Sequence, residues 1–122
     1  MKKCILLYDD DIEILIVCKI ILEKEGYRVE TRIICDNILD DIIHVKPDLI
    51  LMDLWIPEIG GEKATKLMKE NKATQHIPIV LFSANAETEE IYRRTNASGF
   101  LKKPFDLEDL LNIVKNNILV IS

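Results

Sequence analysis

Two short apolar runs in this chain each end abruptly in carboxylates. Residues 4–8 lead into three consecutive aspartates at positions 9–11, and residues 49–52 lead into Asp53. A short apolar run of this kind is typical of a strand buried on both faces of a parallel sheet. The polar residue that follows marks the carboxyl end of the strand, where open α/β sheets bind their ligands. Acids gathered at that edge repel one another unless a cation lies among them, so the sequence predicts an acidic pocket that binds a cation.

Strand-like and helix-like segments alternate along the whole chain. We predict strands over residues 5–8, 27–33, 49–52, 77–82 and 99–102. We predict helices over residues 12–25, 37–45, 62–70, 87–95 and 107–118. Gly26 and Pro47 stop the first two helices, and Asp106 caps the last. Strands joined by helices require right-handed crossovers, so the predicted fold class is α/β, with a doubly wound five-stranded parallel sheet in one domain over residues 1–122.

Composition limits the class of protein. With 122 residues, 48% of them hydrophobic and 30% charged, the chain is long enough for one globular domain with a sizeable core. The net charge of −5 argues against nucleic acid as a direct partner, because phosphate binding needs basic faces. The apolar stretch over residues 12–22 is too short to cross a membrane. Three cysteines without metal-ligand spacing favour buried free thiols and a cytoplasmic location.

The predicted strand ends contribute different chemical groups to one edge of the sheet. The first strand supplies Asp9 and Asp10, the third supplies Asp53, the fourth ends in Ser83, and Lys103 follows the fifth. Mg²⁺ typically binds one or two carboxylates and keeps several waters. One carboxylate could then act as a nucleophile toward phosphorus and form an aspartyl phosphate. The metal, the ammonium and the hydroxyl would each neutralise one oxygen of the transferred group.

These segments resemble the receiver domains of the response-regulator family of two-component signalling. The matching segments are residues 8–11 (Tyr-Asp-Asp-Asp), 53–58 (Asp-Leu-Trp-Ile-Pro-Glu) with Gly61, 82–84 (Phe-Ser-Ala) and 99–105 (Gly-Phe-Leu-Lys-Lys-Pro-Phe). Any one alone is weak, but all four in order on an alternating strand-and-helix framework are specific. The resemblance implies a flavodoxin-like (βα)5 fold with strand order 2-1-3-4-5. It also implies a phosphoryl-accepting switch that is not an enzyme in the ordinary sense but catalyses its own phosphorylation and dephosphorylation.

The resemblance assigns the metal and phosphate roles residue by residue. Asp53 would accept the phosphoryl group from a sensor histidine kinase or a histidine phosphotransfer protein. Asp10 and Asp53 would bind Mg²⁺, or Mn²⁺, directly. Asp9 would act largely through water, and the backbone carbonyl of Trp55 would provide a further metal ligand. Asp11 is better explained as the cap of the first helix.

The resemblance also assigns a switch. Ser83 and Lys103 would contact the phosphoryl oxygens, and the Lys103–Pro104 bond is expected to be cis. Ser83 and Phe100 would couple the site to a face formed by the fourth helix, the fifth strand and the fifth helix, where a downstream partner binds. Phe100 differs from the Tyr usual in the family, so it has no hydroxyl to hydrogen-bond.

Two positions flanking the site are expected to modulate hydrolysis of the aspartyl phosphate. Trp55 lies two residues past Asp53 and is bulkier than most residues found there, and Asn85 lies two residues past Ser83. In the family these two positions modulate how easily water attacks the phosphoryl group. We predict that Trp55 shields the aspartyl phosphate and slows its hydrolysis.

Apolar residues lie on both sides of the first predicted helix. At 100° per residue, one side carries Ile14, Val17, Cys18 and Ile21. Ile16 and Ile20 fall on the opposite side among charged residues. They either lie under a neighbouring element, or are scattered surface residues, or form a docking patch for the histidine-bearing helical domain of a kinase or phosphotransfer protein.

Other functions fit the sequence less well. A metal-dependent phosphatase of the haloacid-dehalogenase type needs Asp-x-Asp, whereas Asp53 is followed by Leu54 and Trp55. A flavodoxin-like cofactor site needs an uncharged phosphate loop where this chain has residues 9–11. A degenerate receiver that works only as a binding module would not need the full set of metal-binding and phosphate-binding residues. Stand-alone regulator, phosphorelay shuttle and excised receiver remain open, as does a phosphorylation-dependent dimer; we expect the stand-alone single-domain type.

Overall fold

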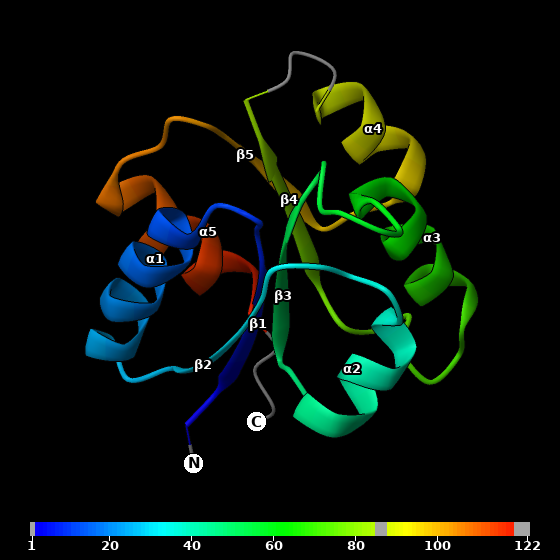
Figure 1. Cartoon of the computed structure of the whole chain (residues 1–122), viewed down its shortest axis with the longest axis horizontal. Coiled ribbons are helices and arrows are strands. Elements are labelled where there is room, and N and C mark those ends of the chain that lie inside the picture. Colours follow the sequence, from blue (N-terminus) through cyan, green and yellow to red (C-terminus); the bar gives the residue numbers. More distant parts are fainter. Residues whose placement is uncertain (1, 85–87, 119–122) are drawn as a thin grey trace.

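The computed structural model of the chain describes residues 2–84 and 88–118. Its centre is one sheet of five parallel strands in the order β2-β1-β3-β4-β5 (Figure 1). The strands are β1 (Cys4–Tyr8), β2 (Arg28–Arg32), β3 (Leu49–Asp53), β4 (Ile79–Ser83) and β5 (Gly99–Lys102). This is the predicted fold class and strand order, so both predictions are confirmed.

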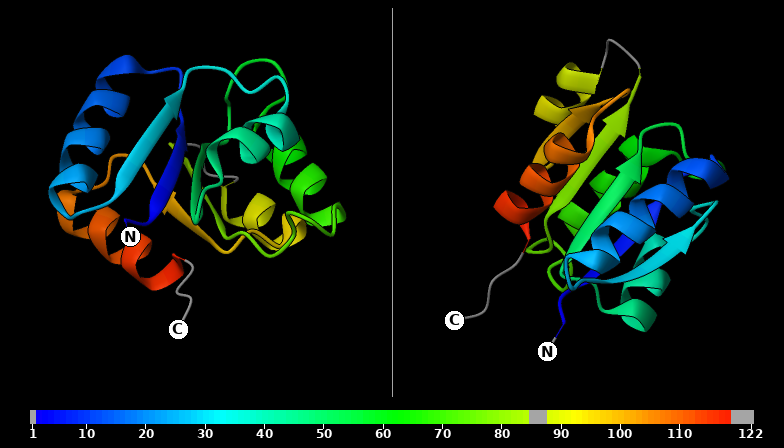
Figure 2. Two further views of the ribbon diagram at one scale, coloured as in Figure 1. Left: turned by 90° about the horizontal axis from the view of Figure 1, so that it is seen from below. Right: turned by 90° about the vertical axis from the view of Figure 1, so that its left-hand side faces the viewer.

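Helices cover both faces of the sheet. They are α1 (Ile12–Lys24), α2 (Ile38–Val45), α3 (Gly61–Glu70), α4 (Thr88–Thr95) and α5 (Leu107–Asn117). α1 and α5 lie on one face, and α2, α3 and α4 lie on the other (Figures 1 and 2). The core is therefore split in two by the sheet, and alternate residues of β1 serve each half: Leu6 and Tyr8 pack toward α2 and α3, and Ile5 and Leu7 pack toward α1 and α5.

Local signals account for most element boundaries. The Asp11 carboxylate accepts hydrogen bonds from the backbone N–H groups of Glu13 and Ile14, which confirms it as the cap of α1. Asp106 and Asp109 form a capping box at the start of α5. β4 starts at Ile79, two residues later than predicted, because the preceding Pro78 has no N–H for the ladder and contributes only its carbonyl, to Ile50 N–H.

Only part of the apolar surface of α1 is buried. Leu15, Cys18 and Leu22 face the core, at spacings of three and four residues. Of the apolar residues that share one side of this helix, Cys18 is buried, whereas Val17 is 53% exposed. The alternative in which Ile16 and Ile20 lie under a neighbouring element is wrong, since both are more than half exposed.

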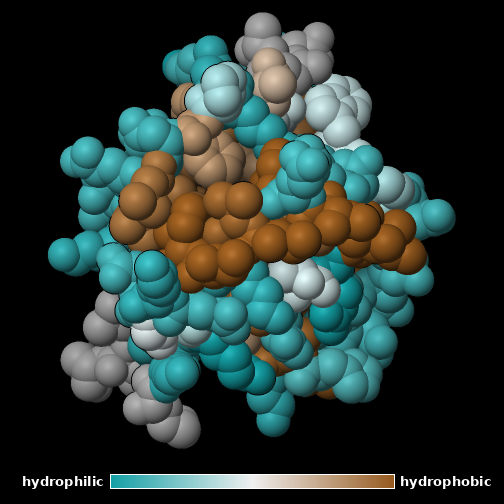
Figure 3. All heavy atoms as spheres, turned by 60° about the vertical axis from the view of Figure 1, so that its left-hand side comes forward, coloured by the Kyte–Doolittle hydropathy of each residue, from teal (hydrophilic) through white to brown (hydrophobic). Residues whose placement is uncertain are grey.

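Exposed apolar residues form a band on this side of the molecule. Figure 3 shows a continuous hydrophobic band crossing the side of the molecule that carries α1. The exposed large apolar residues on α1 and on the segment after β2 are Ile12, Ile16, Val17, Ile20, Ile33 and Ile34. Within residues 2–84 and 88–118, no helix is both long and apolar enough to span a membrane.

Candidate functional site

Three carboxylates meet at the carboxyl edge of the sheet. Asp9 and Asp10 follow β1, and Asp53 ends β3, which lies beside β1. One carboxylate oxygen from each can be chosen so that all three lie within 4.8 Å of one another. Asp9 is fully buried, Asp53 nearly so, and Asp10 is exposed. This arrangement fits the oxygen-rich, anionic coordination that a hard divalent cation requires.

Lys103 brings a positive charge into this group. Its Nζ donates to Asp9 Oδ2 at 2.7 Å and lies 3.7 Å from Asp53 Oδ1. It also lies 5.0 Å from the centre of the Phe82 ring. The Lys103 backbone N–H donates to the Ser83 carbonyl at 3.0 Å, and the Lys103–Pro104 peptide bond is cis, as the resemblance implied. The ammonium is thus placed by β4 and the end of β5.

The pKa of Asp53 is perturbed by its surroundings. Burial raises the pKa of this carboxyl from its ordinary 3.8 to about 6. The nearby Lys103 ammonium lowers the pKa and Asp9 raises it, but burial has the largest effect. A perturbed carboxyl beside a charge partner at a strand end is typical of a functional site.

The space above Asp53 is open to a small group. A hollow of about 420 Å³ is lined by Asp53, Trp55, Ser83, Ala84 and Lys103. The Trp55 side chain is 57% exposed at its edge, while Ser83 is buried at the end of β4. Asp53 and Ser83 therefore face one hollow together with the Lys103 ammonium. Asn85 lies outside the described residues.

The loop after Asp53 is held close to the strand. The N–H of Gly61 donates to the Leu54 carbonyl at 2.9 Å. A Cβ at Gly61 would lie 2.8 Å from the Asp53 carbonyl oxygen and from the Leu54 Cα, so only glycine permits this approach. The segment is also tied to the loop after β2, because Cys35 N–H donates to Pro57 O and Ile59 N–H donates to Cys35 O.

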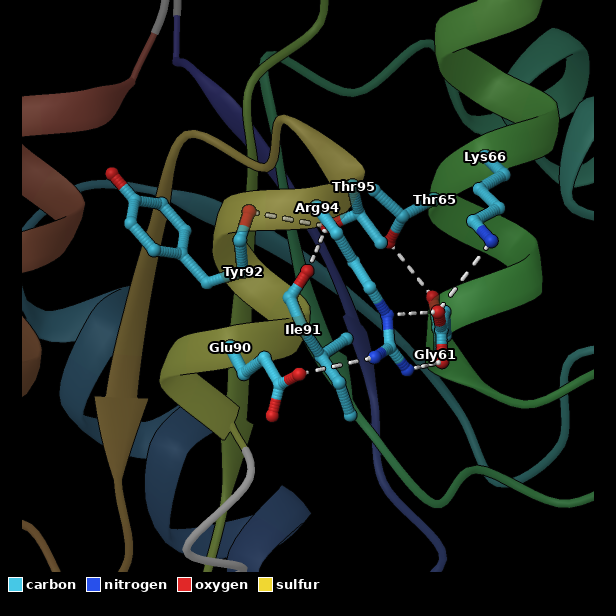
Figure 4. Close-up of polar contacts among 9 residues, drawn as sticks. Gly61, Thr65, Lys66, Glu90, Ile91, Tyr92, Arg94 and Thr95 are labelled. Carbon is cyan, nitrogen blue, oxygen red and sulfur yellow. Dashed lines mark hydrogen bonds and ion pairs between the residues drawn. The ribbon is translucent and has the colours of Figure 1, made fainter.

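α4 is attached on two sides near the site. Figure 4 shows Arg94 reaching from α4 toward the start of α3, beside Gly61. Arg94 donates two hydrogen bonds to the Glu62 carboxylate, at 2.7 and 2.9 Å. On its other side, the ring of Tyr92 packs on Phe100 of β5 with centroids 5.1 Å apart. Phe100, the expected switch residue, is thus half-buried against an aromatic neighbour.

One polar pair near the site was missed from the sequence. Tyr8, the last residue of β1, donates from its hydroxyl to Asp41 Oδ2 of α2 at 2.6 Å. A signal for it existed: Tyr8 is the only polar side chain other than a thiol in the run over residues 4–8, and a buried hydroxyl needs an acceptor. The sequence does not indicate which acceptor.

Comparison with known proteins gives one consistent family. The family model described as "Response regulator receiver domain" matches residues 5–115. The chain is 29% identical over 119 residues to the polar-differentiation response regulator DivK of Brucella ovis, covering 95% of this chain and 96% of DivK. It is 31% identical over 115 residues to the DNA-binding dual master transcriptional regulator RpaA of Synechocystis sp., covering 91% of this chain and 47% of RpaA. The chain thus spans about half the length of RpaA.

Solved structures agree with this assignment. The chemotaxis response regulator CheY4 of Vibrio cholerae superposes with a TM-score of 0.88 and 25% identity, covering 97% of this chain and all (100%) of CheY4. A response regulator structure from Chloroflexus aurantiacus gives a TM-score of 0.89 at 24% identity, covering 95% of this chain and 97% of that one. The second similarity supports the fold only.

Proposed function

Because this chain belongs to the response regulator receiver domain family, whose members are phosphoryl-accepting signalling switches of two-component systems, we propose that Asp53 is its phosphoacceptor. One observation carries the proposal: Asp53 is the carboxylate that lies both within the acidic cluster and 3.7 Å from the Lys103 ammonium, on the wall of an open hollow. We infer that residues 1–122 form one receiver domain, which acts as a signalling domain rather than as an ordinary turnover enzyme.

Receiver domains generally bind Mg²⁺ at an acidic pocket, and the carboxylates of this chain fit that ion. Asp10 and Asp53 would be direct ligands of Mg²⁺ or Mn²⁺, with Asp9 acting largely through water and the Trp55 backbone carbonyl as a further ligand. When bound, the ion would offset the repulsion among the carboxylates and draw charge from one phosphoryl oxygen. The position of Lys103 against Asp9 supports this division, because that carboxylate already has a cationic partner.

The transfer step follows from the groups around the hollow. A carboxylate oxygen of Asp53 forms a bond to phosphorus while the P–N bond of the phosphohistidine donor breaks, and its electron pair stays on the imidazole nitrogen, which takes up a proton. The Ser83 hydroxyl and the Lys103 ammonium border the hollow and would bind the other two phosphoryl oxygens. Water later attacks the same phosphorus, the P–O bond to Asp53 breaks, and inorganic phosphate leaves while the carboxylate is regenerated. Trp55 and Asn85, the latter outside the described residues, would modulate this step.

The signal would pass from the hollow to α4, β5 and α5. Ser83 ends β4 immediately before the segment that leads to α4, and Phe100 on β5 packs against Tyr92 of α4. A change in the position of Ser83 is therefore transmitted to the surface of α4 and β5, where a downstream partner would bind. That face is also where a phosphorylation-dependent dimer would form.

The phosphodonor would dock beside the hollow. Receiver domains take phosphate from histidine kinases or phosphotransfer proteins, and Ile16 and Ile20 present an apolar stripe on α1 to such a helical partner. A groove of about 490 Å³ leads from this helix to the site, lined by Ile14, Val17, Pro104 and Phe105 among others. All three cysteines are buried and unpaired, which supports a cytoplasmic location for the encounter.

A phosphorylation assay tests the central claim. The protein is incubated with acetyl phosphate and Mg²⁺, and the label is located by mass spectrometry. The expected product is one hydroxylamine-labile phosphoryl group on Asp53, absent from Asp53→Asn and absent in EDTA. Label on another residue, or sustained multiple turnover of phosphate esters, would overturn the proposal, and the latter would favour a metal-dependent phosphatase.

A further inference from the structure

A buried hydroxyl and a carboxylate are joined at the end of β1. Tyr8 is fully buried, and its Oη donates to Asp41 Oδ2 at 2.6 Å. The Asp41 side chain is 18% exposed, and its other oxygen lies 3.9 Å from Arg32 Nε. Burial and this hydrogen bond raise the pKa of Tyr8 well above its ordinary value, so the hydroxyl stays a donor. A hydrogen bond from a neutral donor to a charged acceptor is stronger than one between neutral groups.

This contact belongs to a group of interactions that hold the backbone where the acidic pair Asp9 and Asp10 begins. Tyr8 and Arg32 are register partners and are the last residues of β1 and β2. Asp9 directly follows Tyr8, and its backbone N–H donates to the Arg32 carbonyl at 3.1 Å. We call Tyr8, Arg32 and Asp41 the strand-end bracket. It ties α2 to both strands at the point where the backbone of Asp9 leaves the sheet.

The side chain of Asp9 is fixed as well. Its Oδ1 accepts the Asp11 N–H at 2.9 Å, and its Oδ2 accepts the Lys103 ammonium at 2.7 Å. Asp10 differs from Asp9 because it is exposed, and the backbone on either side of it sets its position in the site. The position of the Asp10 carboxylate relative to Asp53 therefore depends on how firmly the bracket holds the end of β1.

We propose that Tyr8 and Asp41 are positioning residues that set the divalent-cation affinity of the acidic cluster without contacting the ion. The proposal rests on the metal-binding role proposed above. Mg²⁺ demands near-ideal octahedral geometry, so small displacements of its carboxylates weaken binding. Partners that orient metal ligands matter for affinity for the same reason. Asp41 would not contact the ion. It would hold Tyr8 and the Arg32 end of β2 in place, and these in turn position the metal ligands.

A metal titration of three variants tests this inference. Mg²⁺ binding is followed by the fluorescence of Trp55, the only tryptophan of the chain, which borders the hollow. Asp41→Ala leaves the buried Tyr8 hydroxyl without its acceptor. The Mg²⁺ concentration at half-saturation is expected to rise about tenfold, the lower end of the effect of removing such orienting partners. Tyr8→Phe is expected to raise the Mg²⁺ concentration at half-saturation by a smaller factor. Asp41→Asn keeps an oxygen acceptor for Tyr8, so its Mg²⁺ concentration at half-saturation is expected to stay within about twofold of the wild-type value.

A control and a second readout separate positioning from stability. Asp40→Asn makes the same charge change one residue earlier in α2, at an exposed carboxylate, and is expected to leave half-saturation unchanged. With acetyl phosphate, the bracket variants are expected to react slowly at low Mg²⁺ and near the wild-type rate at saturating Mg²⁺, because Asp53, Ser83 and Lys103 are intact.

The outcomes are distinct. A lower melting temperature in EDTA with unchanged Mg²⁺ half-saturation would make the bracket merely structural and overturn the inference. If Asp41→Ala does not fold, Tyr8→Phe decides the question, since it removes one oxygen atom. A wild-type protein that shows no Mg²⁺ response would refute the proposed function rather than the bracket.

Discussion

Individual residues at this site differ sharply in their surroundings although several share the same chemistry. Asp9 is buried and paired with Lys103, Asp10 is exposed, and Asp11 caps a helix. Asp53 is buried and keeps its ammonium neighbour at a longer distance, 3.7 Å. Four aspartates thus have four environments, and burial raises the pKa of Asp53 to about 6.

Trp55 gives a prediction at the scale of one side chain. Its side chain is more than half exposed on the wall of the hollow that holds Asp53. Replacing it by Asn removes the bulky ring and admits water to the phosphoryl group. Trp55→Asn is expected to shorten the half-life of the aspartyl phosphate about tenfold, a barrier change on the order of 1.4 kcal/mol.

The measurement is the loss of label after removal of acetyl phosphate. Trp55→Phe, which keeps an aromatic ring, is the matched control and should retain most of the lifetime. An unchanged half-life in Trp55→Asn would show that the ring does not shield the phosphoryl group.

At the scale of elements, α1 presents one face to the core and another to solvent. Ile16 lies on α1 and is 54% exposed. Ile16→Lys is expected to slow phosphotransfer from the cognate histidine kinase or phosphotransfer protein about tenfold, because a charge replaces an apolar contact at the interface. Phosphorylation by acetyl phosphate should be unaffected, since the site is intact.

Ile43→Lys is the control for this prediction. Ile43 is 66% exposed, somewhat more than Ile16, but it lies on α2, on the other side of the sheet. Equal rates for wild type and Ile16→Lys, or equal losses in both variants, would remove α1 as the docking surface.

The attachment of α4 to α3 gives a second prediction at this scale. Arg94 and Glu62 form a two-pronged ion pair between the helices, and their side chains are 50% and 30% exposed. Arg94 lowers the pKa of Glu62, mainly through their hydrogen bonds. Solvent screens such a pair, so a double-mutant cycle with Glu62→Gln and Arg94→Gln is expected to give a coupling of about 0.5–1 kcal/mol.

The reference is the pair Arg93–Glu89, which is 2.6 Å long but lies within α4 alone. Its cycle, measured by the same urea denaturation, should give a smaller value of about 0.3–0.5 kcal/mol. Equal couplings for the two pairs would show that the contact between α3 and α4 contributes nothing beyond a local helix pair.

For the whole molecule, the buried site lowers global stability. The folded pKa of Asp53 is about 6, above its ordinary 3.8, so the native state binds this proton more tightly than the unfolded chain does. The resulting stabilisation is fully present below about pH 4 and is lost as the pH rises through about 6. At neutral pH the charged Asp53 carboxylate therefore lowers the free energy of unfolding, and the proposed function requires this charged form.

Asp53→Asn removes that charge. In EDTA at pH 7.5 the variant is expected to be more stable than the wild type by on the order of 2 kcal/mol, or roughly 5–10 °C in melting temperature. The difference should shrink as the pH is lowered to 5. Asp36→Asn, which makes the same charge change at an exposed position, should show neither effect. A variant no more stable than the wild type at pH 7.5 would contradict the raised pKa.

Much of this architecture could be read from local sequence. The apolar runs ending at Tyr8 and Met52 predict strands, and Asp11 and Asp106 predict helix starts, because periodicity and capping act over a few residues. All ten elements lie where predicted to within two residues, as far as the described residues extend. Parallel connections then bring Asp9, Asp53 and Ser83 to one edge whatever the details of packing.

Other features were decided only by the tertiary structure. Lys103 and Asp9 are 94 residues apart in sequence, and Tyr8 and Asp41 are 33 apart. Which face of α1 is buried depended on how that helix lies on the sheet, so that Cys18 is buried while Val17 on the same side is 53% exposed. The sequence alone thus determined which chemical groups gather at the carboxyl edge, since strand direction follows from the order of elements. Only packing between distant segments determined which of those groups are buried and how they pair, because side-chain contacts across elements leave no periodic signal in the chain.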